Sequence, residues 1–188
     1  MTKRCFIAIN LPQSAKDQLA ELLKQLKKIN SAQEIRYVKA KNIHLTLHFL
    51  GNLKEQQIGQ VQEILKHQAK KHQAKKLVTD KIDAFPDLKR PRVIFLGSEK
   101  IGEESLASLQ NNLGQDLEKI GIEIDHRPWH AHLTLARIVG PCQFKTQNLN
   151  LPKLEIPINS VELMESQLSP YGAEYKILTS FTLKESRS

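Results

Sequence analysis

The sequence predicts an α+β fold in which two similar lobes with antiparallel sheets face each other across a central cleft, with helices on the outside. Segments with apolar residues at helical spacing are interspersed with short, apolar, strand-like runs. Short connections join several of these runs, which favours antiparallel hairpins over a doubly wound parallel sheet. One tetrapeptide, His-Leu-Thr-Leu, occurs twice, at 44–47 and at 132–135. This repeat suggests that the two lobes are structurally related.

The elements follow from these patterns in chain order. Amphipathic helices are expected at 15–29, 54–73 and 103–120, because leucine and isoleucine recur there every three or four residues. In the first of them, Pro12 and Ser14 offer a stop and a helix N-cap. Strands are expected at 5–11, 35–38, 44–50, 77–85, 93–96, 122–124, 132–139, 156–164 and 174–183.

Length and composition are those of an ordinary globular protein. The chain has 188 residues, of which 40% are apolar and 26% charged, so a single bilobal domain over residues 1–188 is expected. No apolar run is long enough to cross a bilayer, and the N-terminus lacks the pattern of a secretory signal. The two cysteines, Cys5 and Cys142, form no C-x-x-C pair. We therefore expect a cytoplasmic monomer without membrane contact.

The net charge of +8 suits an anionic binding partner without identifying one. Lysine and arginine attract phosphates through their field, so the charge is consistent with RNA as a partner. A basic surface also serves solubility. The charge alone therefore does not decide between these readings.

The repeated tetrapeptide carries the chemistry. On a strand, residues i and i+2 point to the same face, so each copy presents a histidine beside a threonine and directs its leucines to the core. The candidate residues are His44 with Thr46 and His132 with Thr134. A lone His-x-Thr is common by chance, but two copies in strand-like settings indicate function.

Two imidazoles suit the hydrolysis of a phosphodiester without a metal ion. A neutral histidine takes a proton from the attacking water, and a protonated one gives a proton to the leaving oxygen. Each such group typically contributes roughly 10²–10⁴-fold to the rate. The threonine hydroxyls can donate to non-bridging phosphate oxygens as negative charge grows.

The chain resembles the 2H phosphoesterase superfamily, and within it the bacterial and archaeal RNA 2′,3′-cyclic phosphodiesterases, first noticed for 2′-5′ RNA ligase activity. Four stretches carry the resemblance, which spans nearly the whole chain: 4–9, 36–38, 42–51 with the first His-Leu-Thr-Leu, and 127–137 with the second. It implies the bilobal fold and hydrolysis of RNA 2′,3′-cyclic phosphate ends to 2′-phosphomonoesters, with no cofactor and no metal.

The same resemblance implies residue roles. His44 would be the proton donor to the 3′ oxygen and His132 the proton acceptor from water. Thr46 and Thr134 would bind the phosphate, with Arg137 adding positive charge. Phe49 is the candidate platform for stacking a nucleobase.

Strict strand alternation conflicts with two of these roles. Arg137 and Phe49 each lie five residues after a motif histidine, so alternation places them on the opposite face. For Arg137 we follow the resemblance, which requires a bulge, twist or strand end nearby. For Phe49, alternation favours a core position. It also places His48 on the face of His44, at the rim of the cleft.

Three alternative functions remain open. A 2′-5′ oligonucleotide phosphodiesterase or ligase would use the same two imidazoles. A zinc-dependent hydrolase could be built from His44, Asp125, His130 and His132, since His-x-His can bind a metal on a strand. A non-catalytic RNA-binding module would rely on basic charge alone, although the chain is only 5% aromatic and lacks a stacking signature.

Overall fold

The computed structural model describes residues 1–79, 81–97, 103–147, 149, 151, 153–169 and 172–185. Within this part of the chain there are three α-helices, one short 3-10 helix and ten strands. The helices are α1 (Gln13–Ile29), α2 (Glu55–Ala69) and α3 (Glu103–Lys119), with the 3-10 helix η1 at Ala40–Asn42. The strands are β1 (Thr2–Asn10), β2 (Ile35–Tyr37), β3 (His44–Lys54), β4 (Lys75–Thr79), β5 (Lys81–Phe85), β6 (Val93–Gly97), β7 (His132–Ile138), β8 (Leu154–Ile158), β9 (Ser160–Ser169) and β10 (Gly172–Thr182).

The main sheet has eight strands, in the order β10-β9-β1-β3-β7-β6-β5, with β2 also paired to β7. Its strand pairs are antiparallel, and β4 pairs with β8 in a separate two-stranded sheet. The predicted α+β class with antiparallel sheets is therefore confirmed. The two strands that carry His-Leu-Thr-Leu, β3 and β7, are neighbours at the centre of the sheet, where the two halves of the molecule meet.

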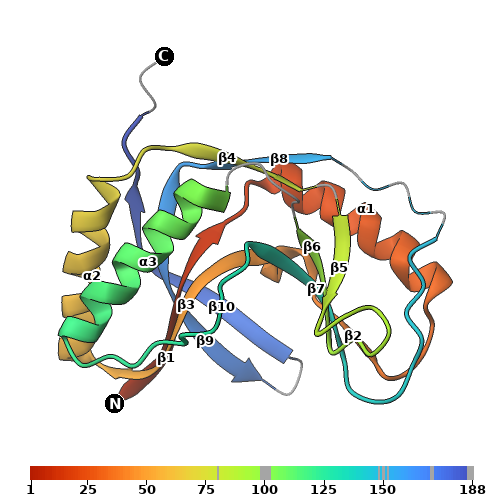
Figure 1. Cartoon of the computed structure of the whole chain (residues 1–188). Coiled ribbons are helices and arrows are strands. Elements are labelled where there is room, and N and C mark those ends of the chain that lie inside the picture. Colours follow the sequence, from red (N-terminus) through yellow and green to blue (C-terminus); the bar gives the residue numbers. More distant parts are fainter. Residues whose placement is uncertain are drawn as a thin grey trace.

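The helices flank the strands, as Figure 1 shows: α2 and α3 lie side by side on one flank, and α1 lies on the other. Each helix buries its apolar stripe, which for α1 consists of Leu19, Leu22, Leu23 and Leu26. The leucines of both tetrapeptides belong to the same core. Burying these leucines fixes the register of both motif strands, because a one-residue slip would expose them.

Three expected strands differ from the structure. The run 77–85 is divided between β4 and β5, which belong to different sheets, and the run 156–164 is divided between β8 and β9. The residues 122–124 form no strand. Strand-forming residues continue on both sides of each boundary, so the composition of a run alone does not reveal where the chain passes from one sheet to another.

In the part of the chain that the structure describes, no helix has the length and apolar character needed to span a membrane.

Candidate active site

The two motif strands bring four polar side chains onto one face of the sheet. Leu45 of β3 pairs with Leu133 of β7 in an antiparallel register, and both leucines are fully buried. The neighbouring positions therefore set His44 across from Thr134, and Thr46 across from His132. Side chains directly opposite on such strands lie about 4.5–5.5 Å apart at Cβ, and diagonal neighbours about 7–8 Å apart. The two histidines are diagonal neighbours, which leaves room between them for a phosphate.

Both imidazoles are held by the same kind of hydrogen bond. Nδ1 of His44 lies 2.8 Å from the carbonyl oxygen of Asn42, and Nδ1 of His132 lies 2.8 Å from that of His130. A carbonyl only accepts, so each Nδ1 donates its proton, and Nε2 is left to exchange protons with a substrate. The two copies of the motif are therefore alike in this respect too: each histidine bonds to the backbone carbonyl two residues before it.

Each imidazole also lies between two aromatic rings. The ring centroids of Phe6 and Tyr175 are 4.9 and 5.0 Å from that of His44. Those of Phe85 and Phe95 are 5.1 and 5.4 Å from that of His132. Sequence reasoning missed these four residues, because they lie on strands far from the motifs in the chain and only the sheet order brings them together.

Burial lowers the pKa of both motif histidines. For His44, removal from water is the largest cause, opposed by the hydrogen bond to Asn42 and reinforced by the positive charges of Lys16 and His132. For His132, burial again comes first, opposed by its carbonyl bond and reinforced by the charge of Arg137 among others. The two rings are therefore close enough for the charge of one to affect the other, and both are biased toward the neutral form in the free protein.

A β-bulge follows the His-x-Thr positions in each motif strand. On β3, Thr46 pairs with Ala8 and His48 with Ile7, which leaves Leu47 as an extra residue. The second copy, on β7, has the same irregularity where it pairs with β6. Thr134 pairs with Phe95 and Ala136 pairs with Ile94, which leaves Leu135 as an extra residue. An extra residue reverses the alternation of side chains beyond it. The burial pattern agrees, since two consecutive residues are buried at each bulge.

The bulge on β7 resolves the conflict over Arg137. Beyond Leu135 the alternation is reversed, so Arg137 is exposed on the face of His132 and Thr134. Of the three features that would allow Arg137 to reach this face, a bulge, a twist or a strand end, the structure has the bulge.

The bulge on β3 corrects two expectations. Phe49 is 64% exposed rather than in the core, and its ring centroid lies 6.3 Å from that of Phe6, the neighbour of His44. His48 is 3% exposed on the other face, where its Nε2 lies 2.7 Å from the carbonyl oxygen of Gln110. The predictions that Phe49 lies in the core and that His48 lies at the rim of the cleft were both wrong. They assumed that side chains alternate without interruption, whereas the extra residue Leu47 reverses the alternation.

Trp129 links the two halves of the site. Its indole Nε1 donates a hydrogen bond of 3.0 Å to the carbonyl oxygen of Thr46. The residue comes from the segment that leads into β7, so the second motif supports the backbone of the first.

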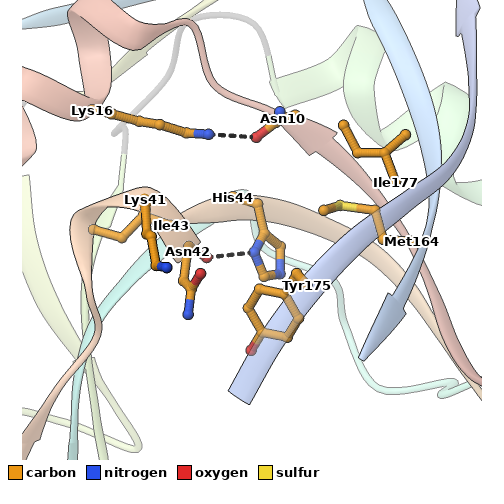
Figure 2. Close-up of a pocket in the computed structure, with 9 residues that line it drawn as sticks. All are labelled: Asn10, Lys16, Lys41, Asn42, Ile43, His44, Met164, Tyr175 and Ile177. Atoms are coloured by element: carbon orange, nitrogen blue, oxygen red, sulfur yellow. Dashed lines mark hydrogen bonds between the residues drawn. The ribbon is translucent and has the colours of Figure 1, made fainter. Parts of the chain in front are cut away.

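A pocket of about 110 Å³ adjoins His44. Figure 2 shows the residues that line it. Lys16 borders it with its ammonium group 2.8 Å from Oδ1 of Asn10, and Lys41, Tyr175 and Ile177 contribute further walls. Burial lowers the pKa of Lys16, while the carboxylate of Glu162 opposes that shift. The pocket thus places a partly buried ammonium group beside the first motif histidine.

The residues considered for zinc are arranged differently from a metal site. The carboxylate of Asp125 binds the guanidinium of Arg127, whose Nε lies 2.9 Å from Oδ1. Among the described residues, no three His, Cys, Asp or Glu side chains are grouped so that they could hold a metal ion. The thiol of Cys5 is no better placed for chemistry, since burial raises its pKa to about 11.

Comparison with known proteins connects this arrangement with one family. The family model for LigT like Phosphoesterase matches residues 9–95, which include the first motif. A Bacillus subtilis protein named RNA 2′,3′-cyclic phosphodiesterase is 30% identical over 132 residues, covering 70% of this chain and 69% of that protein. The chain belongs to the LigT-like phosphoesterase family.

Other relatives extend the match to nearly the whole chain. An Archaeoglobus fulgidus protein of the same name is 29% identical over 184 residues, covering 95% of this chain and 99% of that one. The crystal structure of TT0787 of Thermus thermophilus superposes with a TM-score of 0.81 at 26% identity, covering 98% of this chain and 100% of the other. Apo LigT of Escherichia coli superposes with a TM-score of 0.79 at 23% identity over 97% of this chain and 98% of the other, which shows the shared fold.

Proposed function

We propose that this LigT-like phosphoesterase hydrolyses RNA 2′,3′-cyclic phosphate ends to 2′-phosphomonoesters. A water oxygen attacks the phosphorus while its proton passes to Nε2 of His132. The bond between phosphorus and the 3′ oxygen breaks, and His44 gives its Nε2 proton to that oxygen. The products are a 2′-phosphate and a free 3′-hydroxyl, and a solvent proton exchange restores the starting state of both imidazoles.

The observation that carries this proposal is the diagonal pair of imidazoles with both Nδ1 atoms bonded to carbonyls. That arrangement supports a donor and an acceptor on either side of one phosphorus. The names of the relatives supply the substrate class.

The remaining side chains on this face have roles that follow from their chemistry. Thr46 and Thr134 donate their hydroxyls to the non-bridging oxygens, and Arg137 balances the negative charge that grows there. Phe49, exposed on the same face, stacks the terminal nucleobase. The reaction needs no metal or other cofactor, because both proton transfers are provided by the chain.

The site draws on both halves of the chain, so we propose that residues 1–188 act as one bilobal domain. A single copy contributes both motifs and both aromatic pairs, and a monomer is therefore sufficient for activity. We place this monomer in the cytoplasm, acting on RNA.

The direct test is product analysis. Purified protein is incubated with excess EDTA and an oligonucleotide that ends in a 2′,3′-cyclic phosphate, and the 2′- and 3′-phosphates are separated by chromatography. We expect complete conversion to the 2′-phosphate, unaffected by the chelator. A 3′-phosphate product, or loss of turnover with EDTA, would refute the proposal.

A further inference from the structure

The two ends of the substrate-binding face differ in chemistry. Beyond Thr46, the strand β3 presents the exposed ring of Phe49 next to that of Phe6. Beyond Thr134, the equivalent position on β7 is Arg137, so one end is aromatic and the other is cationic.

The cationic end contains a second arginine. Arg36 of β2 pairs directly with Arg137 of β7, and residues paired in this way point to the same face of a sheet. Val93 of β6 pairs with Arg137 from the other side, and Phe85 of β5 pairs with Val93. Because Phe85 packs on His132, this whole row belongs to the face that carries the catalytic candidates.

Both arginines of this pair are exposed. Among the described residues, neither guanidinium forms an ion pair or a side-chain hydrogen bond. Like charges directly opposite each other destabilise a sheet. Such a pair is costly to the free protein, and an external anion would relieve the repulsion.

Two lysines add positive charge beside His44. Lys41 lies in η1, between Arg36 and His44 in the chain, and lines the pocket beside His44 together with Lys16 (Figure 2). These two ammonium groups lie beside His44, on the side of the pocket, and Phe49 lies beside Phe6, whose ring packs on that of His44.

We propose that Arg36 binds the phosphodiester that precedes the cyclic phosphate in the RNA strand, while Arg137, its partner across the strand pair, faces the cyclic phosphate itself. The inference rests on the proposed function and extends it: the preferred substrate is an oligonucleotide rather than a mononucleoside cyclic phosphate. The terminal base lies toward Phe49, and the strand leaves the site across Arg36 and Lys41.

Two substrates separate this role from catalysis. One is a mononucleoside 2′,3′-cyclic phosphate, which lacks the preceding phosphodiester, and the other is a short oligonucleotide with the same cyclic end. The variants are Arg36→Met, which removes the charge, and Arg36→Lys, which keeps it. Lys28→Met is the matched control, because Lys28 is exposed at the end of α1, away from the motif face.

For Arg36→Met we expect kcat/KM on the oligonucleotide to fall about tenfold at low salt, while the value on the mononucleoside stays within about twofold. The slope of log kcat/KM against log salt on the oligonucleotide should flatten by about 0.7, the value for one phosphate contact on a single strand. Arg36→Lys should keep most of the slope, and Lys28→Met should match the wild type. Thermal melting of Arg36→Met should be unchanged or slightly higher, since a repulsion is removed.

Equal losses on both substrates, or an unchanged salt slope for Arg36→Met, would overturn the inference while leaving the proposed function intact. A wild-type protein that hydrolyses neither substrate would instead overturn the proposed function. The two failures are therefore distinguishable.

Discussion

At the scale of single residues, the two imidazoles have matched surroundings, although we propose different roles for them. Each Nδ1 is bonded to the carbonyl two residues upstream, and each ring lies between two aromatic rings. The positive charges that help to lower their pKa values come from different residues: Lys16 and His132 act on His44, and His130 and Arg137 act on His132.

Removing either imidazole should slow the reaction strongly. We expect His44→Ala and His132→Ala each to lower kcat by at least about 10²-fold, because each removes a positioned proton donor or acceptor. His126→Ala is the matched control, since that histidine is exposed and lies 3.5 Å from Glu118, outside the motif face. Steady-state kinetics on a cyclic-phosphate end would measure the effect, and near wild-type rates in either motif variant would contradict the account.

The threonines should matter less. Thr46→Ala and Thr134→Ala should each lower kcat by about 10–10³-fold, since each removes one donor to the developing charge. Thr46→Ser and Thr134→Ser keep the hydroxyl and should recover most of the rate. Equal loss in the serine and alanine variants would show that the hydroxyls do not act as donors.

The rate should depend on pH in a bell shape with an acidic optimum. Catalysis needs one protonated and one neutral imidazole. Burial lowers the pKa of both His44 and His132. Both limbs of the pH profile of kcat/KM should therefore lie below pH 6.5, the ordinary pKa of histidine. A bound phosphate is an anion and favours the imidazolium form, which raises both pKa values. The alkaline limb of kcat should therefore lie at higher pH than that of kcat/KM. Superimposable profiles for the two parameters would contradict this reasoning.

At the scale of the elements, the paired bulges decide which residues share the face of the motif histidines. Leu47 and Leu135 end the two tetrapeptides and are both extra residues in their ladders. Each reverses the alternation, so Phe49 and Arg137 share the face of the histidines, while His48 and Ala136 are buried. The two copies of the motif are thus related in backbone geometry as well as in sequence.

The link between Trp129 and β3 can be tested at this scale. Trp129→Phe removes the five-membered ring of the indole with its N–H and leaves the carbonyl of Thr46 without its partner, so we expect the free energy of unfolding to fall by at least about 1 kcal/mol. The turnover should fall modestly, since the backbone between His44 and the bulge loses support. Urea unfolding followed by circular dichroism suits this variant, because Trp129 is the only tryptophan. An unchanged unfolding midpoint would show that the bond contributes nothing.

Much of this could be predicted from the sequence, because periodicity records burial directly. The leucine spacing of α1 predicted the helix, and the apolar settings of the two motifs predicted strands. The division between β8 and β9 has a trace in the pattern: Ile156 and Ile158 are buried at even positions, and Val161 and Leu163 at odd ones.

The bulges and the aromatic neighbours of the motif histidines could not be predicted from the sequence. A bulge depends on how the partner strand pairs, which no local pattern records, so alternation misplaced Phe49 and His48. Phe6, Tyr175, Phe85 and Phe95 lie near the motif histidines only because of the strand order. The family resemblance, rather than the residue pattern, assigned Arg137 correctly to the motif face.

At the scale of the whole molecule, the buried histidines link folding to pH. Burial is the main cause of the lowered pKa of His44, His48 and His132, so the unfolded chain binds more protons than the folded one below the ordinary histidine pKa of about 6.5. Stability should therefore be full above that pH and fall as the pH drops through the folded pKa values.

Urea unfolding at pH 7.5 and pH 5.5 would measure this dependence, with a lower midpoint expected at pH 5.5. A bound nucleoside 2′-phosphate should reduce the difference, because its charge favours the protonated forms of His44 and His132. An unchanged or higher midpoint at pH 5.5 would contradict the assigned direction of the pKa shifts.

The most direct test of acid–base catalysis by two imidazoles changes the leaving atom. A cyclic substrate with sulfur in place of the 3′ oxygen expels a thiolate, which needs no proton from an acid. On this substrate His44→Ala should recover a rate close to that of the wild-type protein, while His132→Ala should stay impaired, because the attacking water still needs a base. Equal impairment of the two variants on the oxygen and sulfur substrates would contradict the assignment of donor and acceptor.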